Sequence, residues 1–304
     1  MNLRDLTYII AVAENRHFGK AAEQCFVSQP TLSGQIKKLE EELGVSIFER
    51  SNRTVEVTPV GEGIIAYARK VIEQTDAIKA LAQSYHDPLA GPLRIGAIPT
   101  LSPYLIPLIL APLRDNHPQM QLVLSEEQTD QLLHRLKNFQ IDAALLATEI
   151  KDPELTSVPL FNEPFWVAYP RKHSFYEKES IHSKDLKGQD LLLLAKGNCL
   201  ANQVMNVCDI DDRPNLGEMA DLRASSLETL IQMISAGYGI TLLPALAMGG
   251  SWTMGSGVVA QPLEQKGAYR QISLVFRKHF PRQSALDVFS RVILNNLPNT
   301  VNKL

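Results

Sequence analysis

The stretch GKAAEQCFVSQPTLSGQIKKLEEELG, residues 19–44, constrains the fold most strongly. Its first part is rich in alanine and ends in a short turn at Phe26 and Val27. Ser28 then stands where a helix N-cap belongs, and Pro30 falls in the first turn of the next helix. Apolar residues of that helix recur at helical spacing, at Leu32, Ile36, Leu39 and Leu43. Two short helices joined by a tight turn indicate a helix-turn-helix, whose second helix enters the major groove of DNA.

The opposite face of the second helix carries the residues that we expect to contact DNA: Gln29, Pro30, Thr31, Ser33 and Lys37. A short hairpin is predicted after Gly44, with Arg50 and Arg53 beside its turn, where they would hold phosphate. The alternative is a helical hairpin whose polar face contacts only water. The N-cap Ser28, Pro30 and the turn between Arg50 and Arg53 disfavour this alternative. The net charge of -3 excludes a protein that coats nucleic acid indiscriminately.

Length and composition favour a multidomain cytoplasmic protein. The chain has 304 residues, enough for two or three compact units. Its first residues lack the pattern of an export signal or a membrane span. In a reducing compartment its three cysteines are free thiols by default, so any disulfide would be transient and functional. The cysteine spacing and scattered histidines do not support a metal site, and no cofactor is expected.

A long amphipathic helix is predicted to follow a DNA-binding domain of residues 1–58. This linker helix covers 59–86 and needs a partner for its apolar face, most simply a second copy of itself. The expected assembly is a dimer or a dimer of dimers; packing of the helix on its own domain is the alternative. Residues 87–92, with the sequence DPLAGP, are predicted to form a hinge.

Residues 93–304 alternate strands and helices, as in a parallel sheet with crossover connections. Two lobes are expected, lobe I from about 93–161 and 267–304 and lobe II from about 162–266. Small ligands bind such sheets beyond the carboxyl ends of the strands. Thr100 and Thr129 follow the first two strands and are therefore predicted to lie in a pocket.

Two of the three cysteines lie in the segment GNCLANQVMNVC, residues 197–208. Asn198 is a good N-cap for a helix that begins at Cys199, where the helix N-terminus favours a thiolate. Nine residues of helix rise about 13.5 Å, whereas a disulfide needs Cα atoms roughly 4.4 to 6.8 Å apart. Cys199 and Cys208 can therefore pair only if the helix unwinds. The alternative is that both are small buried apolar residues, which is the expected role of Cys25.

The N-terminal motif resembles that of LysR-type transcriptional regulators, through AAEQCFVSQPTLSGQIKKLEEELGVSIFER and VTPVGE. The whole chain is similar to the peroxide-sensing OxyR branch, through SQPTLSGQIKKLE, GPLRIGAIPT, SSLETL, GYGITLLPALA and both cysteines of the 197–208 segment. The resemblance implies an N-terminal all-α winged helix-turn-helix with a long linker helix. It also implies a C-terminal α/β bilobed effector domain like the periplasmic binding proteins.

The resemblance further implies a transcriptional activator of oxidative-stress genes, and not an enzyme. Hydrogen peroxide would oxidise Cys199 to a sulfenic acid, which Cys208 would resolve to a disulfide. Thr100, Thr129 and Asn198 would surround the peroxide, and Arg270, just before the strand QISLVFR, would supply positive charge. The implied partners are promoter DNA, RNA polymerase, and a cytosolic dithiol reductant of the glutaredoxin or thioredoxin type.

Two departures from the OxyR pattern adjoin the reactive cysteine. Asn198 stands where that branch commonly has histidine, and Ala201 where arginine is expected. Each departure removes a side chain able to stabilise a thiolate. Two other functions remain open at this point: a LysR-type regulator that senses a small metabolite between its lobes with inert cysteines, and a thiol peroxidase. The DNA-binding motif disfavours the peroxidase, since an enzyme that consumes peroxide does not need to bind promoter DNA.

Overall fold

The structure is a computed structural model of residues 1–304, and it describes all of them except 51–54, 85–88, 196, 209–222 and 250–256. The chain divides into two compact units, Met1–Pro88 and Leu89–Leu304. Each unit has its own hydrophobic core. Of the helices in the described ranges, none is long and apolar enough to cross a membrane.

The first unit is a winged helix-turn-helix followed by a long helix. Its elements are α1 (Leu3–Asn15), α2 (Phe18–Gln24), α3 (Gln29–Leu43), β1 (Phe48–Arg50), β2 (Val55–Val57) and α4 (Pro59–Ser84). Strands β1 and β2 pair antiparallel and form the wing. Helix α3 begins where the sequence predicts, because the Ser28 hydroxyl accepts the backbone N–H of Thr31 at 3.3 Å. Leu32, Ile36 and Leu39 are buried as predicted, whereas Leu43 is exposed.

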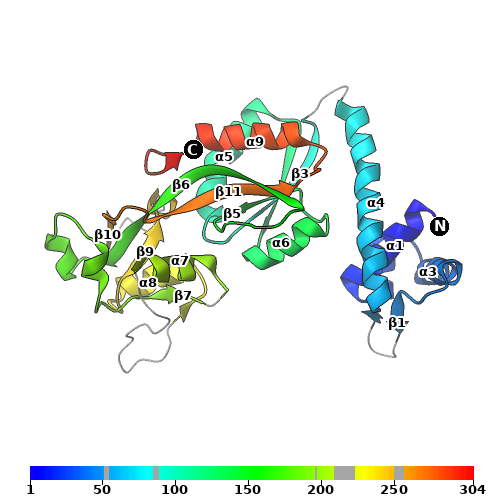
Figure 1. The fold of residues 1–304 in the computed structure, drawn as a ribbon, viewed down its shortest axis with the longest axis horizontal. Coiled ribbons are helices and arrows are strands. Elements are labelled where there is room, and N and C mark those ends of the chain that lie inside the picture. Colours follow the sequence, from blue (N-terminus) through cyan, green and yellow to red (C-terminus); the bar gives the residue numbers. More distant parts are fainter. Residues whose placement is uncertain (51–54, 85–88, 196, 209–222, 250–256) are drawn as a thin grey trace. The chain divides into compact units, whose positions relative to one another are not determined.

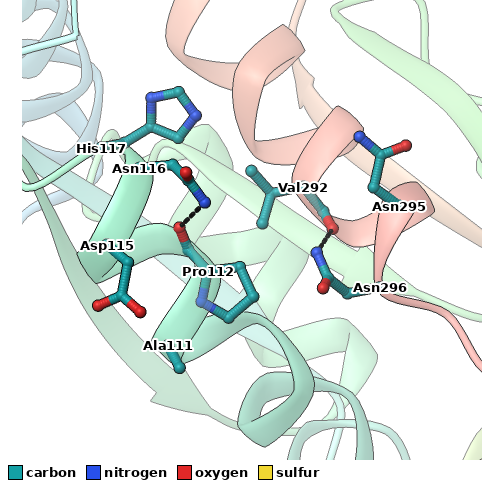
Figure 2. Close-up of a pocket in the computed structure, with 8 residues that line it drawn as sticks. All are labelled: Ala111, Pro112, Asp115, Asn116, His117, Val292, Asn295 and Asn296. Carbon is teal, nitrogen blue, oxygen red and sulfur yellow. Dashed lines mark hydrogen bonds between the residues drawn. The ribbon is translucent and has the colours of Figure 1, made fainter.

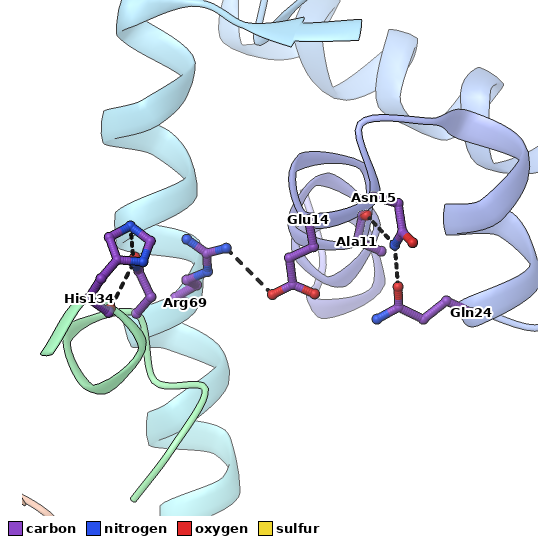
Figure 3. Close-up of polar contacts among 7 residues, drawn as sticks. Ala11, Glu14, Asn15, Gln24, Arg69 and His134 are labelled. Carbon is purple, nitrogen blue, oxygen red and sulfur yellow. Dashed lines mark hydrogen bonds and ion pairs between the residues drawn. The ribbon is translucent and has the colours of Figure 1, made fainter. Parts of the chain in front are cut away.

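Helix α4 packs on its own domain over its first turns and extends beyond it. Ile65 and Ala68 are buried in the helical core. An ion pair between Arg69 and Glu14, 3.5 Å apart, ties α4 to α1, as Figure 3 shows. Further along, Val71 and Ile78 are exposed, Ile78 by 70%. Packing of the helix on its own domain, the alternative that the sequence left open, thus describes only the first part of α4.

The second unit is built of strands and helices. They are β3 (Gly91–Ala97), α5 (Ser102–Asn116), β4 (Met120–Glu126), α6 (Thr129–Lys137), β5 (Ala143–Leu146), β6 (Leu155–Pro170), β7 (Leu193–Leu194), α7 (Cys199–Cys208), β8 (Arg223–Ala224), α8 (Leu227–Ser235), β9 (Thr241–Pro244), β10 (Val258–Pro262), β11 (Tyr269–Arg277), α9 (Gln283–Asn295) and β12 (Asn302–Lys303), with 3-10 helices at Ser174–Glu177, Ser183–Leu186 and Ala245–Gly249. Helical segments separate successive strands except where β5 is followed by β6 and β10 by β11. The main sheet has the order β10-β6-β11-β5-β3-β4. Strand β3 pairs parallel with β4 and β5, as the strand-helix-strand pattern predicts.

Strand β6 connects two lobes, each with a hydrophobic core of its own (Figure 1). As far as Pro164 it pairs with β11, and from Phe165 onward it pairs with β9 and β10. The parallel strands with α5, α6 and α9 form the first core, and α7 and α8 contribute to the second. This is the bilobed α/β arrangement that the sequence predicts.

One boundary prediction is wrong at the site. Arg270 is not placed before its strand but lies inside β11, which begins at Tyr269. There it is opposite Glu163 of β6 in the antiparallel register. A charged side chain is tolerated inside this strand because a buried partner on β6, distant in sequence, compensates its charge.

Candidate functional site

Helix α7 begins at Cys199, as the local pattern predicts, and ends at Cys208. Both cysteines are free, and a helix of this length separates their Cα atoms by about 13.5 Å. That separation is roughly twice the span that a disulfide allows. The two thiols therefore occupy opposite ends of an intact helix in this structure.

Asn198 caps α7. Its side-chain oxygen accepts the backbone N–H of Leu200 at 3.1 Å, which satisfies one of the unpaired donors at the helix N-terminus. The side chain is buried, so this hydrogen bond is sheltered from water. Asn198 therefore has a local structural role, because it fixes where the helix starts and with it the position of Cys199.

The two cysteines have different surroundings. Cys208 is 1% exposed in the core of the second lobe, and this burial raises the pKa of its thiol to about 12. Cys199 is half-buried and packs against the core of the first lobe. Helix α7 therefore lies between the two cores, and Cys208 stays a neutral thiol at physiological pH.

Arg270 and Thr100 meet in a buried polar cluster. The Nη1 of Arg270 donates to the Thr100 hydroxyl oxygen at 2.8 Å, and its Nη2 donates to the Thr100 carbonyl oxygen at 2.9 Å. The Nε of Arg270 donates to Glu163 at 2.8 Å, and the other carboxylate oxygen of Glu163 accepts the backbone N–H of Leu246 at 2.9 Å. All three side chains are almost wholly buried, at 3% exposure or less. The guanidinium of Arg270 faces Thr100, and no acceptor for the Thr100 hydroxyl proton occurs in the part of the chain that the structure describes.

Among the buried side-chain atoms that have no hydrogen-bond partner in the described residues, two oxygens belong to residues that lie just beyond the strand ends or contact the chain there. One is the Thr129 hydroxyl, on the first residue of α6, and the other is the side-chain oxygen of Gln203 on α7. The Gln203 amide nitrogen donates to the carbonyl oxygen of Ala147, just beyond β5, at 2.6 Å. Since buried polar atoms normally have partners, these two oxygens mark places where a small polar ligand would be favoured.

Thr100, Thr129 and Ala147 follow β3, β4 and β5, which are neighbours in the sheet. The carboxyl ends of these parallel strands lie at one edge, where such sheets bind ligands. Sequence reasoning missed Gln203 and Glu163. Gln203 could have been found, because a residue four positions after Cys199 shares its helix face. No local signal marks Glu163.

A hydrogen bond joins the two lobes beside this cluster. The Tyr104 hydroxyl on α5 donates to a carboxylate oxygen of Glu228 on α8 at 2.9 Å. Tyr104 also packs against both cores. Burial, and then the charge of Glu228, raise the pKa of Tyr104, so it remains a donor at neutral pH.

A separate open pocket of about 670 Å³ lies between α5 and α9 (Figure 2). It is lined by Ala111, Pro112, Asp115, Asn116, His117, Val292, Asn295 and Asn296. None of the residues predicted to surround peroxide lines it, so it does not belong to the cysteine site.

The predicted DNA-contacting residues of α3 lie between its first residue, Gln29, and Lys37, just past its middle. Gln29, Pro30 and Thr31 are exposed, and Ser33 is half-buried. Lys37 is exposed and forms an i,i+4 ion pair with Glu41 at 3.8 Å. Arg50 ends β1, although the structure does not describe its side chain, and Arg53 lies outside the described residues. Cys25 packs against the core of this unit, in keeping with its expected structural role.

Two family models match the chain. "Bacterial regulatory helix-turn-helix protein, lysR family" matches residues 3–62, and "LysR substrate binding domain" matches residues 86–298. The chain is 40% identical to the DNA-binding transcriptional dual regulator OxyR of Escherichia coli K12 over 304 residues, which is 100% of this chain and 98% of that protein.

Solved structures of relatives are also similar. A cysteine-to-aspartate variant of OxyR from Pseudomonas aeruginosa is 39% identical with a TM-score of 0.85, over 100% of this chain and 98% of that one. A cysteine-to-serine mutant of OxyR from Corynebacterium glutamicum, with hydrogen peroxide bound, is 33% identical with a TM-score of 0.66. That match covers 97% of this chain and 92% of the other.

Proposed function

Because the chain belongs to the LysR family of transcriptional regulators, in its OxyR branch, we propose that it is a DNA-binding regulator that detects hydrogen peroxide through Cys199. The observation that carries the proposal is the position of two free thiols at opposite ends of α7, between the cores of the two lobes. Oxidation of this pair would change the fold locally. Through the attached DNA-binding domain, that change would activate transcription of oxidative-stress genes.

The chemistry proceeds in two steps. The Cys199 thiolate attacks one peroxide oxygen, so an S–O bond forms, the O–O bond breaks, and the departing hydroxide takes a proton and leaves as water. Cys208 then attacks the sulfenic sulfur, an S–S bond forms, and the sulfenic oxygen leaves as a second water. A dithiol reductant of the glutaredoxin or thioredoxin type returns both residues to thiols by exchange.

The residues that we propose to surround the peroxide are suited to the first step. Thr100 has a hydroxyl proton to donate and Arg270 behind it supplies positive charge, which would stabilise the departing hydroxide. The unpartnered oxygens of Thr129 and Gln203 are acceptors for the two protons of hydrogen peroxide. Asn198 contributes by fixing the start of α7.

The second step requires α7 to unwind. Asn202, Asn206 and Val207 are weak helix formers, which lowers the cost of unwinding. Repacking of α7 between the lobes would shift the interface between effector domains. In a dimer or dimer of dimers held by α4, that shift would alter the spacing of the DNA-binding heads and their contact with RNA polymerase. The exposed Val71 and Ile78 of α4 support such an assembly.

The proposed place of action is the cytoplasm, where disulfides are transient and a dithiol reductant resets the switch. In this proposal the protein is not an enzyme, because one peroxide is consumed for each switching event. A thiol peroxidase would instead turn over repeatedly, and a metabolite sensor would leave both cysteines reduced.

Disulfide mapping separates these functions. Reduced full-length protein receives one equivalent of hydrogen peroxide, and peptides from the wild type, Cys199→Ser and Cys208→Ser are analysed by mass spectrometry. The wild type should form the Cys199–Cys208 disulfide, and Cys208→Ser should stop at a sulfenic acid on Cys199. Unreacted cysteines at micromolar peroxide would contradict the proposal, and continuous peroxide consumption with a reductant would favour the peroxidase.

A further inference from the structure

Phe26 has an unusual backbone conformation for an aromatic residue. It lies in the turn between α2 and α3 with φ +55°, in the left-handed region that bulky residues rarely adopt. Its N–H donates to the Glu23 carbonyl at 3.1 Å, and the N–H of Val27 donates to the Ala22 carbonyl at 3.0 Å. These two bonds define a Schellman motif, in which the left-handed position that Phe26 occupies is usually glycine.

The phenyl ring of Phe26 does not stabilise the fold by packing against the described part of the chain. It is 95% exposed, the highest exposure among the large apolar residues that the structure describes. Glycine at this position would relieve the steric cost of the left-handed conformation and remove an apolar ring from water. The folded chain therefore carries a side chain that is unfavourable for its own stability, which indicates a contact outside the chain.

The position of Phe26 identifies the partner. It directly precedes Val27 and the N-cap Ser28, after which α3 begins at Gln29. The adjoining first turn of α3 is exposed at Gln29 and Thr31 and belongs to the family's helix-turn-helix. When this end of α3 lies in the major groove, DNA faces the turn and leaves little room there for another protein.

We propose that Phe26 reads sequence by packing its ring against the C5-methyl group of a thymine in the major groove. That methyl is the main apolar group that a base edge presents there, and phenylalanine is among the side chains that contact it. The inference rests on the DNA-binding part of the proposed function and is independent of peroxide chemistry. It assigns to the turn a role in base discrimination, beside the polar residues of α3.

Uracil substitution tests this contact, because deoxyuridine differs from thymidine only by the missing methyl. Reduced full-length protein first selects its preferred site from a random-sequence DNA pool. Affinities of the wild type, Phe26→Gly and Phe26→Asn are then measured for that site and for versions in which one thymine at a time is replaced by deoxyuridine. Both substitutions suit the left-handed conformation, so their unfolding midpoints should be no lower than that of the wild type.

One thymine in each half-site should matter to the wild type. Its replacement by deoxyuridine should weaken wild-type binding about fourfold, the equivalent of burying one methyl group. Both variants should bind the unmodified site about fourfold more weakly for each half-site and should not respond to that replacement. Leu43→Ala, at the exposed far end of α3, is the control and should keep the wild-type response.

Three results would overturn the inference. Variants that respond to deoxyuridine as the wild type does would show that the ring does not contact the methyl. An equal loss of affinity on every DNA, including unselected sequence, would place the ring on the sugar-phosphate backbone. Wild-type affinity in both variants with lost transcription activation would assign Phe26 to a protein partner. If the wild-type protein selects no site from the pool, the DNA-binding part of the proposed function is wrong. That result is distinct from a failure of the peroxide chemistry, because the experiment uses no peroxide.

Discussion

Arg270 and Glu163 stand opposite each other in β11 and β6, with 2.8 Å between the Nε of Arg270 and a carboxylate oxygen of Glu163. Neither side chain is exposed to solvent. A buried charge is tolerated when it is paired and hydrogen-bonded, and here the pair also has a geometric consequence. Because Glu163 holds the Nε, the two other nitrogens of Arg270 are directed at Thr100.

Glu163→Gln removes the negative charge and leaves that of Arg270 buried. We expect the free energy of unfolding to fall by about 3 kcal/mol, measured by urea denaturation, because breaking a buried pair leaves an uncompensated charge. The rate of Cys199 oxidation by peroxide should fall about tenfold, because a neutral amide holds the Nε of Arg270 less firmly and its two other nitrogens are then less well directed at Thr100. This positioning effect outweighs the gain in uncompensated positive charge and is smaller than the roughly 100-fold loss typical of removing a direct donor. Glu149→Gln, on the exposed surface, is the control and should change neither. An unchanged oxidation rate in folded Glu163→Gln would refute a positioning role.

Tyr104→Phe should loosen the contact between the lobes. It removes the hydrogen bond from the Tyr104 hydroxyl to the Glu228 carboxylate, which should lower the free energy of unfolding of the reduced protein by about 2 kcal/mol. Adding Glu228→Ala to Tyr104→Phe should cost much less than Glu228→Ala does in the wild type, because each change removes the same hydrogen bond. Strictly additive losses in urea denaturation would show that this hydrogen bond does not contribute.

Sequence reasoning succeeded where the determinants are local. The start of α7 follows from a capping residue, Asn198, and from the apolar spacing of residues that are neighbours in the chain. The Glu163–Arg270 pair joins residues 107 positions apart, and its formation depends on the register of two antiparallel strands. No local pattern specifies that register, so Glu163 could not be recognised as a partner before the fold was known.

Burial is likewise a tertiary property. The Thr129 hydroxyl was expected in a pocket, but only the packed lobes reveal that it and the Gln203 oxygen lack partners among the described residues. The left-handed turn at Phe26 also could not be anticipated, because a left-handed C′ position is read from sequence mainly through glycine. The structure is therefore most informative for side chains whose burial, partners or backbone conformation do not follow from their neighbours in the sequence.

Reduced protein should lose stability at alkaline pH through Cys208. Its thiol has a pKa of about 12 in the folded state, against 9.0 as the ordinary value. The folded state then binds the proton more tightly than the unfolded state, so stability is full below pH 9 and declines as pH rises from 9 toward 12. Urea denaturation across this range should show a steeper decline for the wild type than for Cys208→Ala, in which every other titrating group is retained. Parallel pH profiles would contradict the burial of a neutral thiol.

Asn198→Ala should accelerate disulfide formation by weakening α7. Loss of an N-cap costs about 1 kcal/mol, which raises the population of the unwound segment about fivefold. The step from Cys199 sulfenic acid to the Cys199–Cys208 disulfide should therefore become up to about fivefold faster if unwinding limits it. Rapid quenching with a sulfenic acid trap, followed by mass spectrometry, resolves this step from the initial oxidation. Asn198→Ser keeps a capping oxygen and should resolve its sulfenic acid at the wild-type rate. Equal resolution rates in Asn198→Ala, Asn198→Ser and the wild type would show that the cap on α7 does not control the switch.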